Sequence, residues 1–66
     1  MRRTVNRIAN EIIKTATPQG HHYVDVLIVE TYINHKTNEM FELMYDEDTV
    51  PVSVKNVTTG QVWERD

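Results

Sequence analysis

The sequence predicts an α+β fold, in which one N-terminal amphipathic helix precedes a four-stranded antiparallel β-meander made of two hairpins. Three observations support this fold class. Apolar residues near the N-terminus recur with helical spacing, the remainder is dense in β-branched and aromatic residues, and one turn pattern occurs twice. With 66 residues, the chain is expected to form a single small domain, 1–66.

The helix is predicted over residues 3–16. Its apolar residues are spaced so that they form one continuous stripe along a helix of 3.6 residues per turn. The members of the stripe are Val5, Ile8, Ala9, Ile12, Ile13 and Ala16. Pro18 disfavours the helical conformation at Thr17, so the helix should end before that residue.

Four strands are predicted after the helix, near residues 22–33, 39–45, 50–56 and 61–65. The centre of the first strand, residues 26–29, is apolar at every position. Because alternate residues of a strand point to opposite faces, both faces of this strand should be covered. The helix can cover only one face, which favours a partner chain or a tightly curled sheet on the other.

The same turn chemistry is predicted at 35–38 and at 57–60. Each segment follows an asparagine, contains a threonine, and closes with Asn38 or Gly60, the residue types that adopt positive φ most readily. A type I turn closed by such a residue is a common hairpin connection. Each turn should therefore join two antiparallel strands.

Self-association is expected from the size of the chain. A domain this small has a marginal core and often needs a disulfide, a metal or a second copy for stability. The sequence has no cysteine, which excludes disulfides and thiolate zinc sites. We therefore expect a homodimer, formed through apolar residues that the helix cannot cover: Met40, Met44, Val26 and Ile28.

The leading functional hypothesis comes from the distribution of charge. Residues 1–21 hold four basic and one acidic residue, whereas residues 22–50 hold one basic and seven acidic residues. Such segregation governs association with partners. We expect a non-enzymatic, protein-binding regulatory module, by analogy a phage- or mobile-element-type inhibitor that mimics nucleic acid and occupies a basic nucleic-acid-binding protein. The acidic contact residues would be Glu39, Glu42, Asp46, Glu47 and Asp48.

The alternative is a small regulator that binds DNA or RNA through its basic N-terminal helix. Lysine and arginine side chains bind phosphates, and some of those in the first segment can share one helix face. The candidate residues are Arg2, Arg3, Arg7 and Lys14. The acidic balance of the whole chain favours the protein-binding hypothesis over this one.

Several other classes are disfavoured by missing patterns. No nucleophile–base motif, glycine-rich phosphate loop or cofactor fingerprint is present, so neither enzymatic activity nor a cofactor is expected. The adjacent His21 and His22 would point to opposite sides of an extended chain, and His35 lies in a separate turn, so no metal site is expected. The longest apolar run, residues 26–29, is far too short to span a membrane, and a cytoplasmic location is expected.

Overall fold

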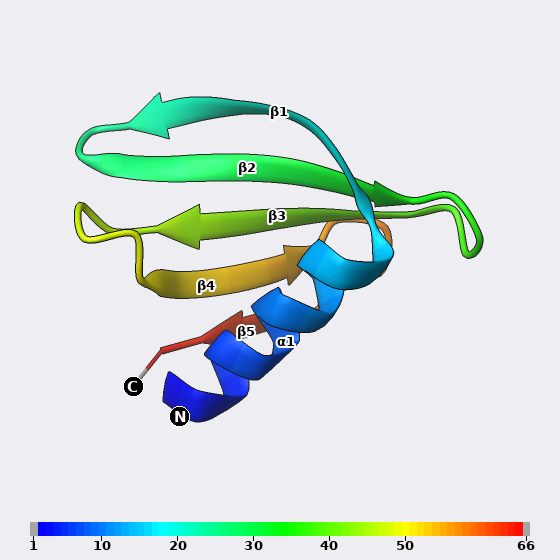
Figure 1. The fold of residues 1–66 in the computed structure, drawn as a ribbon, viewed down its shortest axis with the longest axis horizontal. Coiled ribbons are helices and arrows are strands. Elements are labelled where there is room, and N and C mark those ends of the chain that lie inside the picture. The colour runs from blue at the N-terminus through cyan, green and yellow to red at the C-terminus, as the bar shows by residue number, and fades with distance from the viewer. Residues whose placement is uncertain (1, 66) are drawn as a thin grey trace.

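The computed structural model describes the backbone of residues 2–65 and the side chains of residues 4–65. Within this range one helix is followed by a five-stranded antiparallel sheet whose strands are arranged in sequence order (Figure 1). The elements are α1 (Arg2–Thr15), β1 (Thr17–Val24), β2 (Leu27–Asn34), β3 (Glu39–Tyr45), β4 (Pro51–Asn56) and β5 (Val62–Glu64). The α+β class is confirmed, but the meander has one strand more than predicted.

The extra strand arises because the segment predicted as one strand near 22–33 is a hairpin. Val24 pairs with Leu27, and Asp25 between them adopts a positive φ of 56°. Aspartate tolerates this conformation better than most residues, so it can form a tight turn without glycine. The β-branched residues on both sides concealed the turn in the sequence.

The first strand of this hairpin, β1, begins earlier than predicted and includes Pro18. All eight residues of β1 are exposed, since it lies at one edge of the sheet and runs away from the end of the helix (Figure 1). An edge strand tolerates a residue without an N–H, and the register shifts between Pro18 and Gly20. Pro18 and Gly20, which end the helix in the sequence pattern, are therefore compatible with an edge strand.

The core lies between α1 and one face of the sheet. Val5, Ala9 and Ile12 of the helix pack against a buried cluster on β2, β3 and β4, and the principal contacts of the helix are with β4, β2 and β5. The sheet residues of this cluster are Tyr32, Leu43 and Val54. The predicted stripe is wrong at Ile13, which is 45 % exposed, because the helix crosses the sheet diagonally (Figure 1).

Both predicted turns occur, and each is closed by a hydrogen bond to the backbone carbonyl of an asparagine. Asn38 (φ 63°) donates its backbone N–H to the carbonyl of Asn34 at 2.7 Å, and Gly60 (φ 85°) donates in the same way to Asn56 at 2.7 Å. These turns fix the register of β3 on β2 and of β5 on β4. They thereby determine which side chains lie together on each face of the sheet.

Candidate functional surfaces

The five carboxylates predicted as one acidic contact surface lie in three separate places. Glu39 is at the start of β3, where Oε2 accepts a hydrogen bond from Asn56 Nδ2 at 2.9 Å. Glu42 lies on the opposite face of the same strand, because it is three positions further along the strand. The other three lie in the turn after Tyr45, at the far end of the strand: Asp46, Glu47 and Asp48.

Asp46 is used within the chain and holds the β3–β4 turn. Its Oδ1 accepts the backbone N–H groups of Asp48 at 2.9 Å and Val50 at 3.0 Å. Its Oδ2 pairs with a guanidinium nitrogen of Arg65 at 3.1 Å. The hydrogen bond from Val50, followed by the one from Arg65, holds the pKa of Asp46 below its usual value. This carboxylate is therefore a structural group.

Acid should weaken the fold through Asp46. The pKa of Asp46 is lower in the folded chain, so the unfolded chain binds a proton at this carboxylate more readily. The stabilisation that Asp46 contributes is therefore complete above the unfolded pKa of about 3.9. It is lost as the pH falls through the lower, folded pKa. We expect Asp46→Asn to reduce the pH dependence of the thermal unfolding midpoint below about pH 4. Asp48→Asn, at an exposed neighbour, is the control that should leave the pH dependence unchanged.

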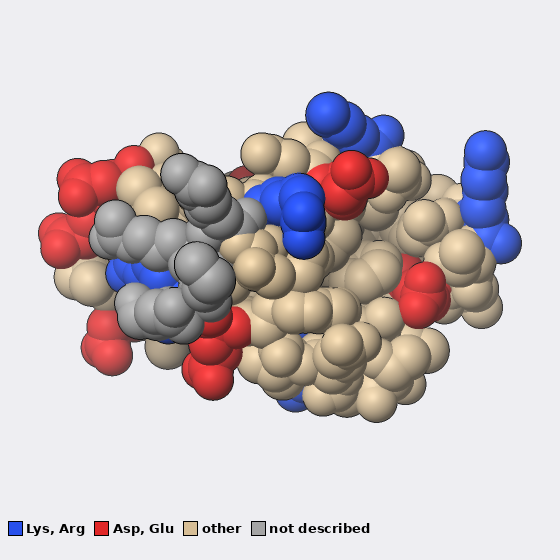
Figure 2. All heavy atoms as spheres, turned by 90° about the horizontal axis from the view of Figure 1, so that it is seen from below, with Lys and Arg blue, Asp and Glu red and all other residues tan. Residues whose placement is uncertain are grey.

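Two turns form an acidic end of the molecule. Glu47 and Asp48 are exposed in the β3–β4 turn, and Asp25 is exposed in the β1–β2 turn. The register pairs Ile28 with Tyr45, so these two turns lie at the same end of neighbouring strands β2 and β3. Red spheres gather at this end on the left of Figure 2. We call Asp25, Glu47 and Asp48 the acidic end; sequence reasoning missed Asp25 because it placed the residue inside a strand.

The basic residues of the helix form an interrupted surface. Arg7 and Lys14 are exposed and two turns apart on one side of α1. Glu11 is exposed between them on the same side, four residues after Arg7 and three before Lys14. This carboxylate reduces the local positive charge that a phosphate backbone would meet. The side chains of the other two candidates, Arg2 and Arg3, lie outside the described part of the chain.

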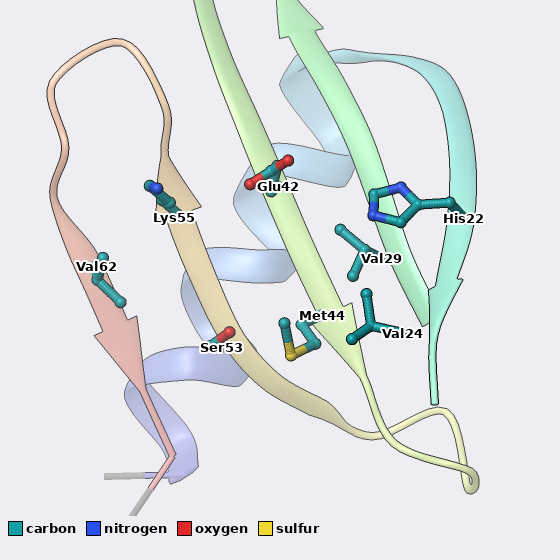
Figure 3. Close-up of a pocket in the computed structure, with 8 residues that line it drawn as sticks. All are labelled: His22, Val24, Val29, Glu42, Met44, Ser53, Lys55 and Val62. Carbon is teal, nitrogen blue, oxygen red and sulfur yellow. The ribbon is translucent and has the colours of Figure 1, made fainter. Parts of the chain in front are cut away.

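The sheet face turned away from α1 is open and hollowed. Figure 3 shows this face with the helix behind the sheet, and a hollow of about 260 Å³ crosses all five strands. Apolar side chains occupy its floor, and Glu42 on β3 lies in register with Lys55 on β4. The lining residues are His22, Val24, Val29, Glu42, Met44, Ser53, Lys55 and Val62. We call this surface the open face.

The four residues predicted to mediate self-association do not share one surface. Met40 and Met44 lie on the open face, since they alternate with the buried Leu43. Ile28 lies on the opposite face, beside the helix, where it lines a second hollow. Val26 lies in the β1–β2 turn and is 59 % exposed. The turn at Asp25 separates Val26 from the strands, and the β2–β3 register, which pairs Val29 with Met44, places Ile28 on the other face.

The second hollow lies on the helix side, and we call it the tyrosine pocket. It has a volume of about 240 Å³ and is lined by Ile13, Ile28, Glu30, Tyr32, Tyr45 and Thr49. The hydroxyl of Tyr32 donates to Glu30 Oε1 at 3.0 Å. Burial, and then the nearby Glu30 carboxylate, raises the pKa of both tyrosines, so both hydroxyls stay protonated at neutral pH. Neither tyrosine was among the residues that the sequence predicted to form a site.

The described side chains outside these surfaces show no metal-binding arrangement. Among the described residues, no group of three histidine, aspartate or glutamate side chains could hold a metal ion. His21 and His22 point to opposite faces of β1, and the His21 ring packs edge-on against Tyr23 with centroids 6.1 Å apart.

The helix found in the described residues is too short and too polar to cross a membrane.

Comparisons with known proteins add no relative. No protein-family model, curated protein or solved structure matches this chain. The acidic end, the open face and the tyrosine pocket are therefore the surfaces from which a function can be inferred.

Proposed function

We propose that this chain is a non-enzymatic protein-binding module that contacts a basic surface of its partner through the acidic end. The observation that supports the proposal is the convergence of Asp25, Glu47 and Asp48 from two turns at one end of the sheet. Within the described part of the chain, none of the three forms an ion pair. Such exposed charges accelerate association with a surface of opposite sign and select against partners of like charge.

A nucleic-acid-binding protein is the class of partner that fits this end best. Its binding groove carries positive charge that normally neutralises phosphates, and carboxylates on a compact projection can occupy the same groove. When the module occupies this groove, nucleic acid cannot bind there, and the module would act as an inhibitor of the nucleic-acid-binding protein. Because Glu39 and Asp46 are bonded within the chain, the mimicry is assigned to the acidic end and not to a row of five carboxylates.

Neutralising the acidic end should weaken partner binding. The immobilised chain would capture a protein from cell extract at low salt, and the purified partner would then be titrated. We expect Glu47→Gln with Asp48→Asn to weaken binding roughly tenfold and to reduce its salt dependence. Glu11→Lys changes the net charge by the same amount at an exposed helix position and should bind like the wild type. Equal affinity of the double variant would contradict the proposal.

Duplex DNA tests the alternative function. Arg7 and Lys14 are the exposed cations of the helix that favour it. DNA binding that falls steeply with salt and disappears in Arg7→Glu with Lys14→Glu would transfer the function to the helix. No binding at low salt would leave the protein-binding proposal in place.

We further propose that two copies pair through the open face. Val24 and Val62 on this face are 46 % and 49 % exposed, which is costly for apolar side chains in a monomer. Glu42 and Lys55 lie side by side, so a two-fold axis can place each near its opposite charge in the second copy. Light scattering should give twice 7.7 kDa for the wild type and for Val26→Lys in the turn, but 7.7 kDa for Met44→Lys. A wild-type mass of one chain would contradict the dimer.

A further inference from the structure

The tyrosine pocket combines a carboxylate, two aromatic rings and an apolar rim. We propose that it is a binding site for a guanidinium group and receives one arginine side chain of the basic partner. This inference rests on the proposed function for the identity of the partner. The pocket itself can be tested without the partner, because its chemistry is that of a single side chain.

The carboxylate of Glu30 supplies the charge that a cation needs. Glu30 is half-buried, and no lysine or arginine in the described part of the chain forms an ion pair with it. The Tyr32 hydroxyl donates to Oε1 at 3.0 Å and holds the carboxylate in place. An ionised carboxylate has about four acceptor positions, so further positions remain for a bidentate guanidinium.

The walls of the pocket favour arginine over lysine. Tyr45 is half-buried and its hydroxyl remains protonated, so its ring keeps a neutral π-face on which a guanidinium can stack, beside the buried Tyr32. Ile28 and the exposed Ile13 provide apolar surface for the methylene stem. Because Ile13 is 45 % exposed, its side chain is accessible to such a ligand.

The size and place of the pocket agree with this occupant. Its volume of about 240 Å³ is below the usual range of small-molecule and cofactor sites, about 300–1,000 Å³, but is adequate for a side chain. Thr49 in its wall belongs to the turn that carries Glu47 and Asp48. An arginine in the pocket would therefore belong to a basic surface that also meets the acidic end.

The test is an NMR titration with blocked tripeptides, acetyl-Gly-Arg-Gly-amide and its citrulline and lysine counterparts. We expect the arginine peptide to shift the side-chain signals of Ile13, Tyr32 and Tyr45. The citrulline peptide, of the same shape without charge, should not shift them, and the lysine peptide should bind more weakly.

Two variants and one control make the result decisive. Glu30→Gln keeps an acceptor for Tyr32 and should weaken arginine-peptide binding about tenfold. Ile13→Lys places a competing cation at an exposed rim position, where the fold is least affected, and should also weaken it. Glu11→Gln removes an exposed carboxylate from α1, outside the pocket lining, and should change nothing.

Four results would overturn the inference: no shift with the arginine peptide, equal shifts with citrulline, equal affinity for the lysine peptide, or undiminished binding by both Glu30→Gln and Ile13→Lys. Any of them would leave the acidic-end proposal intact, because that proposal depends on Glu47 and Asp48. The converse result is that the arginine peptide binds in the pocket while the affinity for the partner does not depend on Glu47 and Asp48. That result would support the pocket proposal and contradict the acidic-end proposal.

Discussion

Replacing Leu43 with alanine is expected to lower the free energy of unfolding by about 2–5 kcal/mol. Leu43 has no exposed surface and lies on β3 in the buried cluster with Val5, Tyr32 and Val54. Truncation removes apolar contacts on every side and leaves a cavity that the rigid sheet cannot close. The core of a chain this small contributes only about 3–5 kcal/mol, so a substantial fraction of the variant should be unfolded.

The neighbouring Met44→Ala is the matched control. Met44 is the next residue on the same strand but points to the open face and is half-buried. Urea unfolding followed by circular dichroism, at a concentration that keeps the chain monomeric, should show a much smaller loss for this variant. Equal losses would contradict the assignment of the core to the helix side of the sheet.

Replacing Asn56 with alanine should cost about 1–3 kcal/mol. Asn56 is the buried polar residue of the core and is 5 % exposed. Its Oδ1 accepts the backbone N–H of Thr59 at 3.1 Å, and its Nδ2 donates to Glu39 at 2.9 Å. Alanine would leave a part-buried carboxylate without this donor and a turn without its side-chain acceptor, and both losses destabilise the fold.

Asn34→Ala separates these two contributions. Asn34 has the equivalent place in the β2–β3 turn, where its Oδ1 accepts the N–H groups of Lys36 at 2.9 Å and Thr37 at 3.2 Å. It is only half-buried, so its loss should be smaller than that of Asn56→Ala in thermal and urea unfolding. A larger loss at Asn34 would show that turn closure, and not the buried bond to Glu39, is the dominant contribution.

Local patterns predicted much of this fold. The helix follows from the 3.6-residue spacing of Val5, Ala9 and Ile12, which are buried as expected. Strands near 39–45 and 50–56 follow from their composition and alternation, and both turns follow from Asn38 and Gly60. These elements could be predicted because each depends on residues that are close together in the sequence, within a single turn, helix or strand.

The hairpin of β1 and β2 could not be predicted from local sequence patterns. Asp25 is a weak turn signal inside a run of β-branched residues, and Pro18 and Gly20 resemble a helix terminus followed by a loop. Only pairing with β2 stabilises β1 as a strand. The turn places Val26 outside the strands, and the register of β2 on β3 places Ile28 on the helix side, so the predicted self-association set is divided.

The amino-acid sequence by itself determined the fold class, the helix, the turn chemistry and the excess of acid after residue 21. Only the tertiary structure decided which charges act together. It brought Asp25 to the end that holds Glu47 and Asp48, engaged Asp46 with Arg65, and placed Glu30 in one pocket with two tyrosines. The physical reason is strand register: a shift of one residue moves every side chain to the other face, and register depends on long-range pairing.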